Sequence, residues 1–147
     1  MSNVLDAWVA QNLDTWAPSS ARDQQSRVRS IEKDQIARVP LARLSTGDIE
    51  RWHTRLRQAG MGDAGIKNLH GVLRGALSQA VRWGWASTNV ASMARLRSTK
   101  TQRRTAMTLD EVRAVIAAAT SIDPAAALML RLAAVTGARR AELAALQ

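Results

Sequence analysis

Apolar residues recur at three- and four-residue steps through most of the chain, which is the spacing of amphipathic α-helices. No window alternates with the two-residue period of a strand for more than a few positions. We therefore expect an all-α fold, with a four-helix domain over residues 1–93. The predicted helices run from Ser2, which can cap the first of them, to Trp16, from Ser19 or Ser20 to Ala37, over 46–60, and from about Asp63 to Trp83.

Residues that favour helix ends mark the boundaries of these segments. Pro18 ends the first predicted helix, and Gly84 suits the position just after the fourth. Ser45 followed by Asp48 is a variant of the capping box, in which two side chains satisfy free backbone N–H groups. Thr108 with Glu111 is a full capping box, so a further helix is expected to begin there.

Residues 108–147 have the pattern of the beginning of a second domain. The stretch "AAALMLRLAAV" is apolar nearly all round, is broken only by Arg131, and is ended by Gly137. A helix of this kind is normally buried inside a larger core. Forty residues cannot enclose it, so we expect the remainder of this domain to be absent from the chain.

The charge balance predicts a polyanionic partner. Lys and Arg total 21 against 12 Asp and Glu, a formal net charge of +9. Nucleic acid is the first expectation and an acidic membrane surface the second. The longest apolar runs are much shorter than a bilayer span and no secretory signal opens the chain, so we expect a soluble, cytoplasmic protein without a membrane partner.

Composition argues against a metal centre and against base stacking. Cysteine is absent, and His53 and His70 have no further ligand at metal spacing, so no metal or other cofactor is expected. Tyr and Phe are absent too. Single-strand binders stack bases on aromatic rings, but here the tryptophans stand beside aliphatic residues on helical segments, which favours core packing. They are Trp8, Trp16, Trp52, Trp83 and Trp85.

Acidic residues are missing from a 46-residue stretch, Ala64 to Leu109. Its segment 94–107 has the composition of a linker. That segment is either a solvated tether or a basic strap that lies along phosphates and releases their counterions, and its uniform charge favours the strap. The eight cations of the stretch are Lys67, Arg74, Arg82, Arg95, Arg97, Lys100, Arg103 and Arg104.

Polar and cationic residues gather on one side of the fourth predicted helix. Lys67 and Arg74 are seven residues apart and therefore share a face, with Asn68 and His70 beside them. Such a face suits insertion into a major groove, although a solvated face would look the same apart from the missing acids. Arg22, on the arginine- and glutamine-rich second helix, is a further candidate DNA contact.

Two adjacent arginines, Arg139 and Arg140, follow Gly137 at the start of another predicted helix. Positive side chains in a first turn oppose the helix dipole. They are favourable if an anion lies there and shares the free N–H groups and the guanidinium groups. The residues alone leave a phosphate clamp and a solvated pair equally open.

The segment "TGARRAELAAL" resembles the first catalytic-box segment of the tyrosine recombinases, or phage-type integrases, Thr-Gly-x-Arg-x-x-Glu-Leu. The stretches "MTLDEVRAVIAAA", "RWGWASTNVA" and "VPLARLSTGDIERW" resemble other parts of the family, so the likeness covers most of residues 19–147. It implies a SAM-like core-binding domain over 1–93, a basic linker over 94–107 and an incomplete catalytic domain over 108–147. It also implies that Arg139 is the catalytic arginine that clamps the phosphate and that Glu142 supports it.

The family breaks and rejoins duplex DNA at specific sites through a 3′-phosphotyrosyl intermediate, without metal or nucleotide. A covalent intermediate divides one difficult transfer into two easier ones, and guanidinium groups stabilise the developing charge. This chain has no tyrosine, so the resemblance implies that it binds DNA without cutting it. The implied partners are a double-stranded recombination site, the missing remainder of the catalytic domain and, in the complete protein, further copies on DNA.

Two other classes remain open. A stand-alone, helix-turn-helix-like regulator would need a self-contained C-terminal part, which the apolar helix argues against. A helical interaction module with incidental charge would bind nucleic acid only weakly and with a shallow salt dependence.

Overall fold

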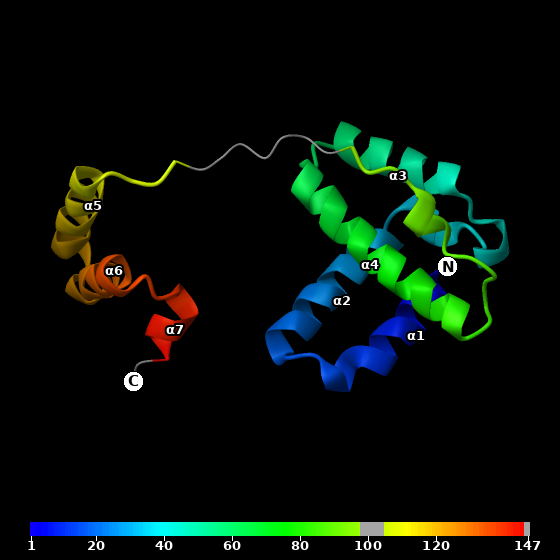
Figure 1. The fold of residues 1–147 in the computed structure, drawn as a ribbon, viewed down its shortest axis with the longest axis horizontal. Helices are drawn as coiled ribbons and strands as arrows, with labels where there is room; N and C mark the ends of the chain where they lie inside the picture. The colour runs from blue at the N-terminus through cyan, green and yellow to red at the C-terminus, as the bar shows by residue number, and fades with distance from the viewer. Residues whose placement is uncertain (98–104, 146–147) are drawn as a thin grey trace. The chain divides into compact units, whose positions relative to one another are not determined.

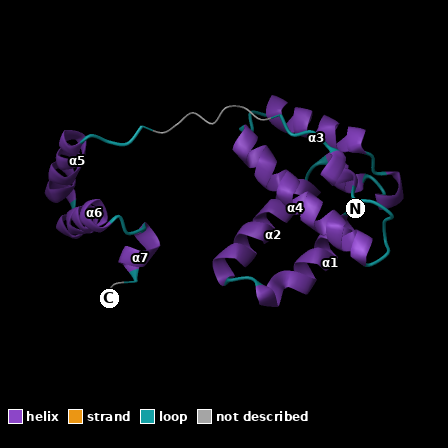
Figure 2. Cartoon of the chain, viewed as in Figure 1, coloured by secondary structure: helices purple, strands orange, loops and turns teal. Residues whose placement is uncertain are grey.

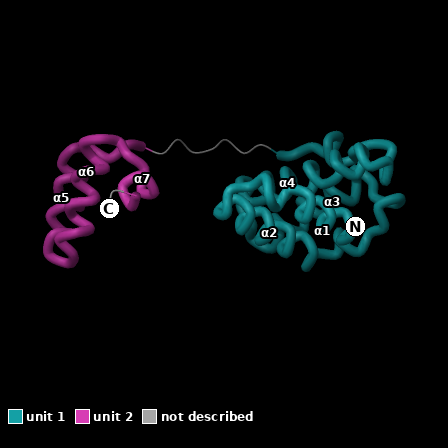
Figure 3. Tube along the Cα trace, turned by 90° about the horizontal axis from the view of Figure 1, so that it is seen from below, with its two compact units in different colours: residues 1–100 teal, residues 101–147 magenta. Residues whose placement is uncertain are grey.

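The computed structural model describes residues 1–97 and 105–145, and within those residues every regular element is a helix (Figures 1 and 2). The all-α fold expected from the sequence is confirmed. The chain forms two compact units, Met1–Lys100 and Thr101–Gln147, which Figure 3 shows in different colours.

Helix α4 is the central element of the first unit. It lies against α1, α2 and α3, and the chain beyond the short helix η4 runs back alongside α3 (Figure 1). Within residues 1–97 the α-helices are α1 (Ser2–Asn12), α2 (Pro18–Glu32), α3 (Thr46–Gln58) and α4 (Asp63–Arg82). The 3-10 helices there are η1 (Leu13–Thr15), η2 (Gln35–Arg38), η3 (Leu41–Arg43) and η4 (Val90–Met93).

The core of this unit joins the apolar stripes of all four α-helices. Leu5 of α1, Ile31 of α2, Trp52 of α3 and Leu73 of α4 are each 0% exposed. Burying a side chain of this size stabilises the fold by about 1.5–3 kcal/mol. Trp52 thus packs in the core as the sequence predicted, whereas Trp85 is 51% exposed and lies 4.7 Å, centroid to centroid, from the Trp83 ring.

Helices α1 and α4 approach each other closely at Gly75. A Cβ at this position would lie 3.3 Å from Cζ2 of Trp8. The Trp8 ring also packs edge-on against Trp16, with ring centroids 5.0 Å apart. The missing side chain of Gly75 therefore lets the Trp8 ring rest directly on the backbone of α4.

Helix ends agree with the sequence where a capping box fixes them and differ at the start of the chain. Both predicted boxes, at Ser45 and at Thr108, are present. Helix α1 begins at Ser2 rather than being capped by it, and it stops at Asn12 because the chain tightens into η1 before Trp16. Pro18 opens α2 instead of Ser19 or Ser20, since the first helical position needs no backbone N–H.

The second unit contains, among its described residues, α5 (Leu109–Ile122), α6 (Pro124–Thr136) and α7 (Arg140–Ala144). Asp123 caps α6, and Gly137 ends it in a left-handed conformation with φ of 68°. Helices α5 and α6 pack against each other, but Ala127 is the one buried residue of α6. Leu128 and Val135 of α6 are 58% and 87% exposed, so contacts within this unit leave most of the apolar surface of α6 uncovered.

Candidate nucleic-acid interface

The outward side of α4 is positively charged. Lys67, Asn68 and Arg74 are exposed there, and Gly71 leaves the backbone open between them. Within the described residues, no salt bridge includes Lys67 or Arg74. Their charges are therefore available to a partner, and the prediction that they contact DNA stays a prediction.

His70 does not belong to this face. The residue is only 5% exposed, and its Nδ1 lies 3.1 Å from Nε2 of His53 on α3. Burial, followed by the charges of His53 and Arg74, lowers the pKa of His70 to about 4. The expectation that His70 contacts DNA is corrected: the ring points into the helix packing, three and four residues from the buried Leu73 and Ile66. That spacing was the sequence signal that assigns His70 to the apolar stripe.

The other candidates are distributed over the first unit and beyond it. Arg22 is exposed on α2, and Arg82 is exposed at the end of α4, where its Nη1 lies 3.3 Å from Oε1 of Gln79. Arg95 and Arg97 are exposed after η4. Lys100, Arg103 and Arg104 lie outside the residues that the structure describes.

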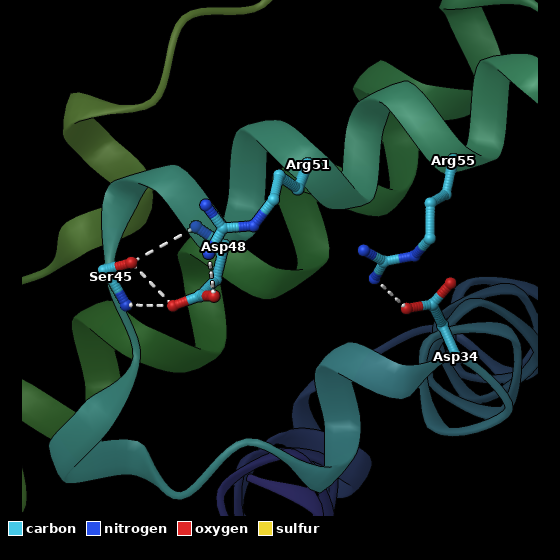
Figure 4. A network of polar contacts seen from close by, with 5 residues as sticks. All are labelled: Asp34, Ser45, Asp48, Arg51 and Arg55. Carbon is cyan, nitrogen blue, oxygen red and sulfur yellow. Dashed lines mark hydrogen bonds and ion pairs between the residues drawn. The ribbon is translucent and has the colours of Figure 1, made fainter.

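Several arginines of α3 are engaged by carboxylates. Nη2 of Arg51 lies 2.6 Å from Asp48, and Nη2 of Arg55 lies 2.6 Å from Asp34 (Figure 4). Asp48 also accepts from the hydroxyl and backbone N–H of Ser45, which together lower the pKa of Asp48 (Figure 4). These two guanidinium groups therefore order the start of α3 and its contact with the preceding loop.

A polar pocket lies between α3 and the segment after η4. It is lined by Glu50, His53, Thr54, Arg57, Arg95 and Arg97. Burial lowers the pKa of His53, the charge of Arg57 lowers it further, and Glu50 and the Arg95 backbone act in the opposite direction. Sequence reasoning singled out Arg95 and Arg97 but missed the α3 wall, although its residues are spaced by three or four.

Arg139 and Glu142 interact at the start of α7. The Glu142 carboxylate accepts the backbone N–H of Arg139 at 2.8 Å and lies 3.7 Å from the Arg139 guanidinium. Arg139 is the residue just before α7, and its side chain is 88% exposed. Glu142 thus engages the backbone N–H of Arg139, whereas the Arg139 side chain is largely exposed and its guanidinium remains accessible to an anion.

Within residues 1–97 and 105–145, no three His, Asp or Glu side chains come together as metal ligands would. None of the described helices combines the length and apolar character needed to cross a membrane.

Comparison with known proteins identifies the fold. No protein-family model and no curated protein matches the chain. A crystal structure of lambda integrase (75–356), a dimer bound to a COC′ core site, matches with 24% identity and a TM-score of 0.80. A second crystal structure of a lambda integrase dimer bound to a COC′ core site matches with 24% identity and a TM-score of 0.79.

These matches cover 93% of this chain but 50% and 39% of the lambda integrase chains, so the chain spans half or less of the length of the structures it matches. The resemblance to the phage-type integrases is confirmed at the level of the fold.

Proposed function

We propose that this chain is the DNA-binding part of a site-specific tyrosine recombinase of the phage-integrase type. The observation that carries the proposal is the coincidence of fold and motif. The fold is that of an integrase solved on a DNA core site, and the same chain carries "TGARRAEL", which resembles the segment of the family that contains its first catalytic arginine.

Duplex DNA is the partner that the charges favour. The net charge is +9, and the cations of the acid-free stretch include those on the outer side of α4. Lys67 and Arg74 would neutralise phosphates, and Asn68 is a residue type that hydrogen-bonds adenine in a major groove. Arg22, Arg82, Arg95 and Arg97 are exposed as further candidate phosphate contacts.

The role proposed for Arg139 is stabilisation of charge on the scissile phosphate. The Arg139 side chain is 88% exposed, and the Glu142 carboxylate lies 3.7 Å from its guanidinium. A fixed guanidinium stabilises the charge that develops on a phosphorus centre under attack. The nucleophilic tyrosine has to come from elsewhere in a complete recombinase, because this chain contains none.

The partners of such a protein are a double-stranded recombination site, the remainder of the catalytic domain and further copies on the DNA. The exposed apolar side chains of α6 support a covering segment, because large apolar side chains such as Val135, at 87% exposure, are normally packed. Integration or excision would take place in the cytoplasm of a bacterial host.

The salt dependence of duplex binding tests the proposal. With about five phosphates neutralised, the logarithm of the association constant should fall against the logarithm of salt concentration with a slope of roughly −4 to −5. Fluorescence anisotropy of a labelled duplex measures this slope. No binding at low salt, or a slope near zero, would exclude a DNA-binding function.

A matched pair of double variants assigns the binding to α4. Lys67→Gln with Arg74→Gln should make the slope shallower by about two, since each cation contributes about 0.9. Arg38→Gln with Arg43→Gln removes the same charge from exposed positions on η2 and η3 and should change the slope less. Equal changes of the salt slope in the two double variants would show that the α4 cations contribute no more to duplex binding than Arg38 and Arg43.

A further inference from the structure

The pocket between α3 and the segment after η4 has a volume of about 290 Å³. Glu50, His53, Thr54 and Arg57 form its α3 wall, because their spacing of three and four residues puts them on one face. Arg95 and Arg97 form the opposite wall. A water molecule occupies about 30 Å³ in the liquid, so the pocket has room for a phosphate group together with several waters.

A hydrogen bond fixes one wall to the other. The backbone N–H of Arg95 donates to Oε1 of Glu50 at 3.1 Å, which joins residues 45 positions apart in the chain. The Glu50 carboxylate therefore positions the segment that carries Arg95 and Arg97. Since this bond engages the backbone, it leaves the Arg95 side chain free to turn into the pocket.

Cations outnumber carboxylates in the lining, with three arginines against Glu50. Arg57 is held in place by Asp63, with Nη2 3.1 Å from Oδ1. Neither Arg95 nor Arg97 forms a salt bridge with any residue that the structure describes. Two arginines with unpaired charges thus face one small volume, an arrangement that favours an anion.

The pocket wall also contains a buried polar atom that lacks a well-formed hydrogen bond. His53 is 4% exposed, and its Nε2 is engaged with His70. Its other ring nitrogen, Nδ1, is buried and forms no hydrogen bond of ordinary geometry with the described residues, although the Arg95 backbone lies close enough to raise the pKa of His53. A buried polar atom of this kind is unfavourable unless a ligand or water completes it.

We propose that this pocket binds a phosphodiester group of the DNA backbone, with Arg95 and Arg97 as its cationic donors and Nδ1–H of His53 as a neutral donor. The proposal rests on the proposed function and adds a specific phosphate site to it. Arg57, fixed by Asp63, supplies further positive potential at the edge of the site.

The histidine pair allows His53 to donate without becoming charged. A neutral imidazole carries one N–H, and the 3.1 Å contact between the two rings needs one proton. If Nδ1 of His70 donates to Nε2 of His53, the proton of His53 must lie on Nδ1, the nitrogen that lacks a well-formed hydrogen bond. A phosphate oxygen is an acceptor, so its binding selects this tautomer of the pair.

Nuclear magnetic resonance of the full chain with nitrogen-15-labelled histidine reads out the site directly. On addition of duplex DNA, the Nδ1 signal of His53 should move toward the range of a protonated ring nitrogen. Inorganic phosphate in place of DNA tests the isolated anion. A response of His53 to inorganic phosphate but not to DNA would overturn the assignment to the DNA backbone.

A double variant, Arg95→Gln with Arg97→Gln, tests the cations. It should weaken duplex binding by at least about tenfold more than Arg38→Gln with Arg43→Gln, and it should abolish the DNA response of His53. If wild-type chain does not bind DNA, the proposed function fails and the site with it. If wild-type chain binds but the two double variants lose affinity equally and His53 is silent, the phosphate site alone is refuted.

Discussion

At the scale of single residues, the contact between His53 and His70 decides the protonation of both rings. Only one proton fits between Nε2 of His53 and Nδ1 of His70 at 3.1 Å, so two charged rings would repel each other there. Burial lowers the pKa of both groups, and that of His70 falls to about 4. In the folded state, both rings of the pair are therefore neutral.

This pair should make the first unit lose stability in mild acid. The unfolded chain binds a proton at His70 with a pKa near 6.5, whereas the folded chain binds it with a pKa of about 4. Between these values the unfolded state holds more protons, so stability is complete above pH 6.5 and falls toward pH 4. The loss is at most about 3–4 kcal/mol from this group.

Urea denaturation at several pH values between these limits measures the effect. His70→Gln should flatten the pH dependence in this window, because glutamine does not titrate. An unchanged pH dependence in the variant would show that His70 is not responsible.

At the scale of elements, two glycines of α4 have opposite packing environments. Gly71 is exposed and a Cβ there would meet nothing within 4 Å, whereas a Cβ at Gly75 would lie 3.3 Å from the Trp8 ring. Alanine is favoured over glycine within a helix by about 1 kcal/mol, both in helix propensity and in unfolded-state entropy. Alanine at Gly71 therefore changes helix propensity alone, whereas alanine at Gly75 also changes the contact between α1 and α4.

Gly71→Ala should raise the free energy of unfolding by about 0.5–1 kcal/mol. Gly75→Ala should leave it unchanged or lower it, because Trp8 must move away from α4. Denaturation followed by circular dichroism compares the two variants. A stabilised Gly75→Ala protein would show that the Trp8 ring yields at little cost.

The sequence predicts those helix boundaries that are set by residues close to one another in the chain. The capping boxes at Ser45 and Thr108 were predictable because each box lies within four residues. The end of α1 was not, since hydrogen bonds of the Asn12 and Thr15 side chains to nearby backbone carbonyls accompany the tightening into η1, and neither residue type is a strong helix stop in the sequence.

The candidate site was predictable on the outer side of α4 and not in the pocket. Lys67 and Arg74 share a face by helical spacing alone. The pocket requires Arg95 to return to Glu50 across 45 residues, and the histidine contact joins residues 17 apart. Such pairings depend on how the helices fold back, which no local pattern of residues records.

At the scale of the whole molecule, the two units differ in how well their helices are packed. In the first unit, all four α-helices contribute side chains to one core. In the second, Ile122 and Val135 are 85% and 87% exposed. The first unit is therefore the better candidate for folding alone.

The chain should form no covalent adduct with DNA. A phosphotyrosyl bond needs a tyrosine, and the sequence has none. Incubation with a nicked suicide duplex, followed by denaturing gel electrophoresis, should show free DNA although the same mixture shows a complex on a native gel. An adduct that survives denaturation would mean another nucleophile and would contradict the proposed chemistry.

The placement of the tryptophans gives the protein a built-in optical label for one unit. Trp8, Trp16, Trp52, Trp83 and Trp85 all precede residue 101, and the chain has no other aromatic side chain besides histidine. Fluorescence excited in the near ultraviolet therefore comes from the first unit alone, whereas far-ultraviolet dichroism sums the helices of both. Recording the two signals in one melting experiment separates the unfolding of the units without cutting the chain.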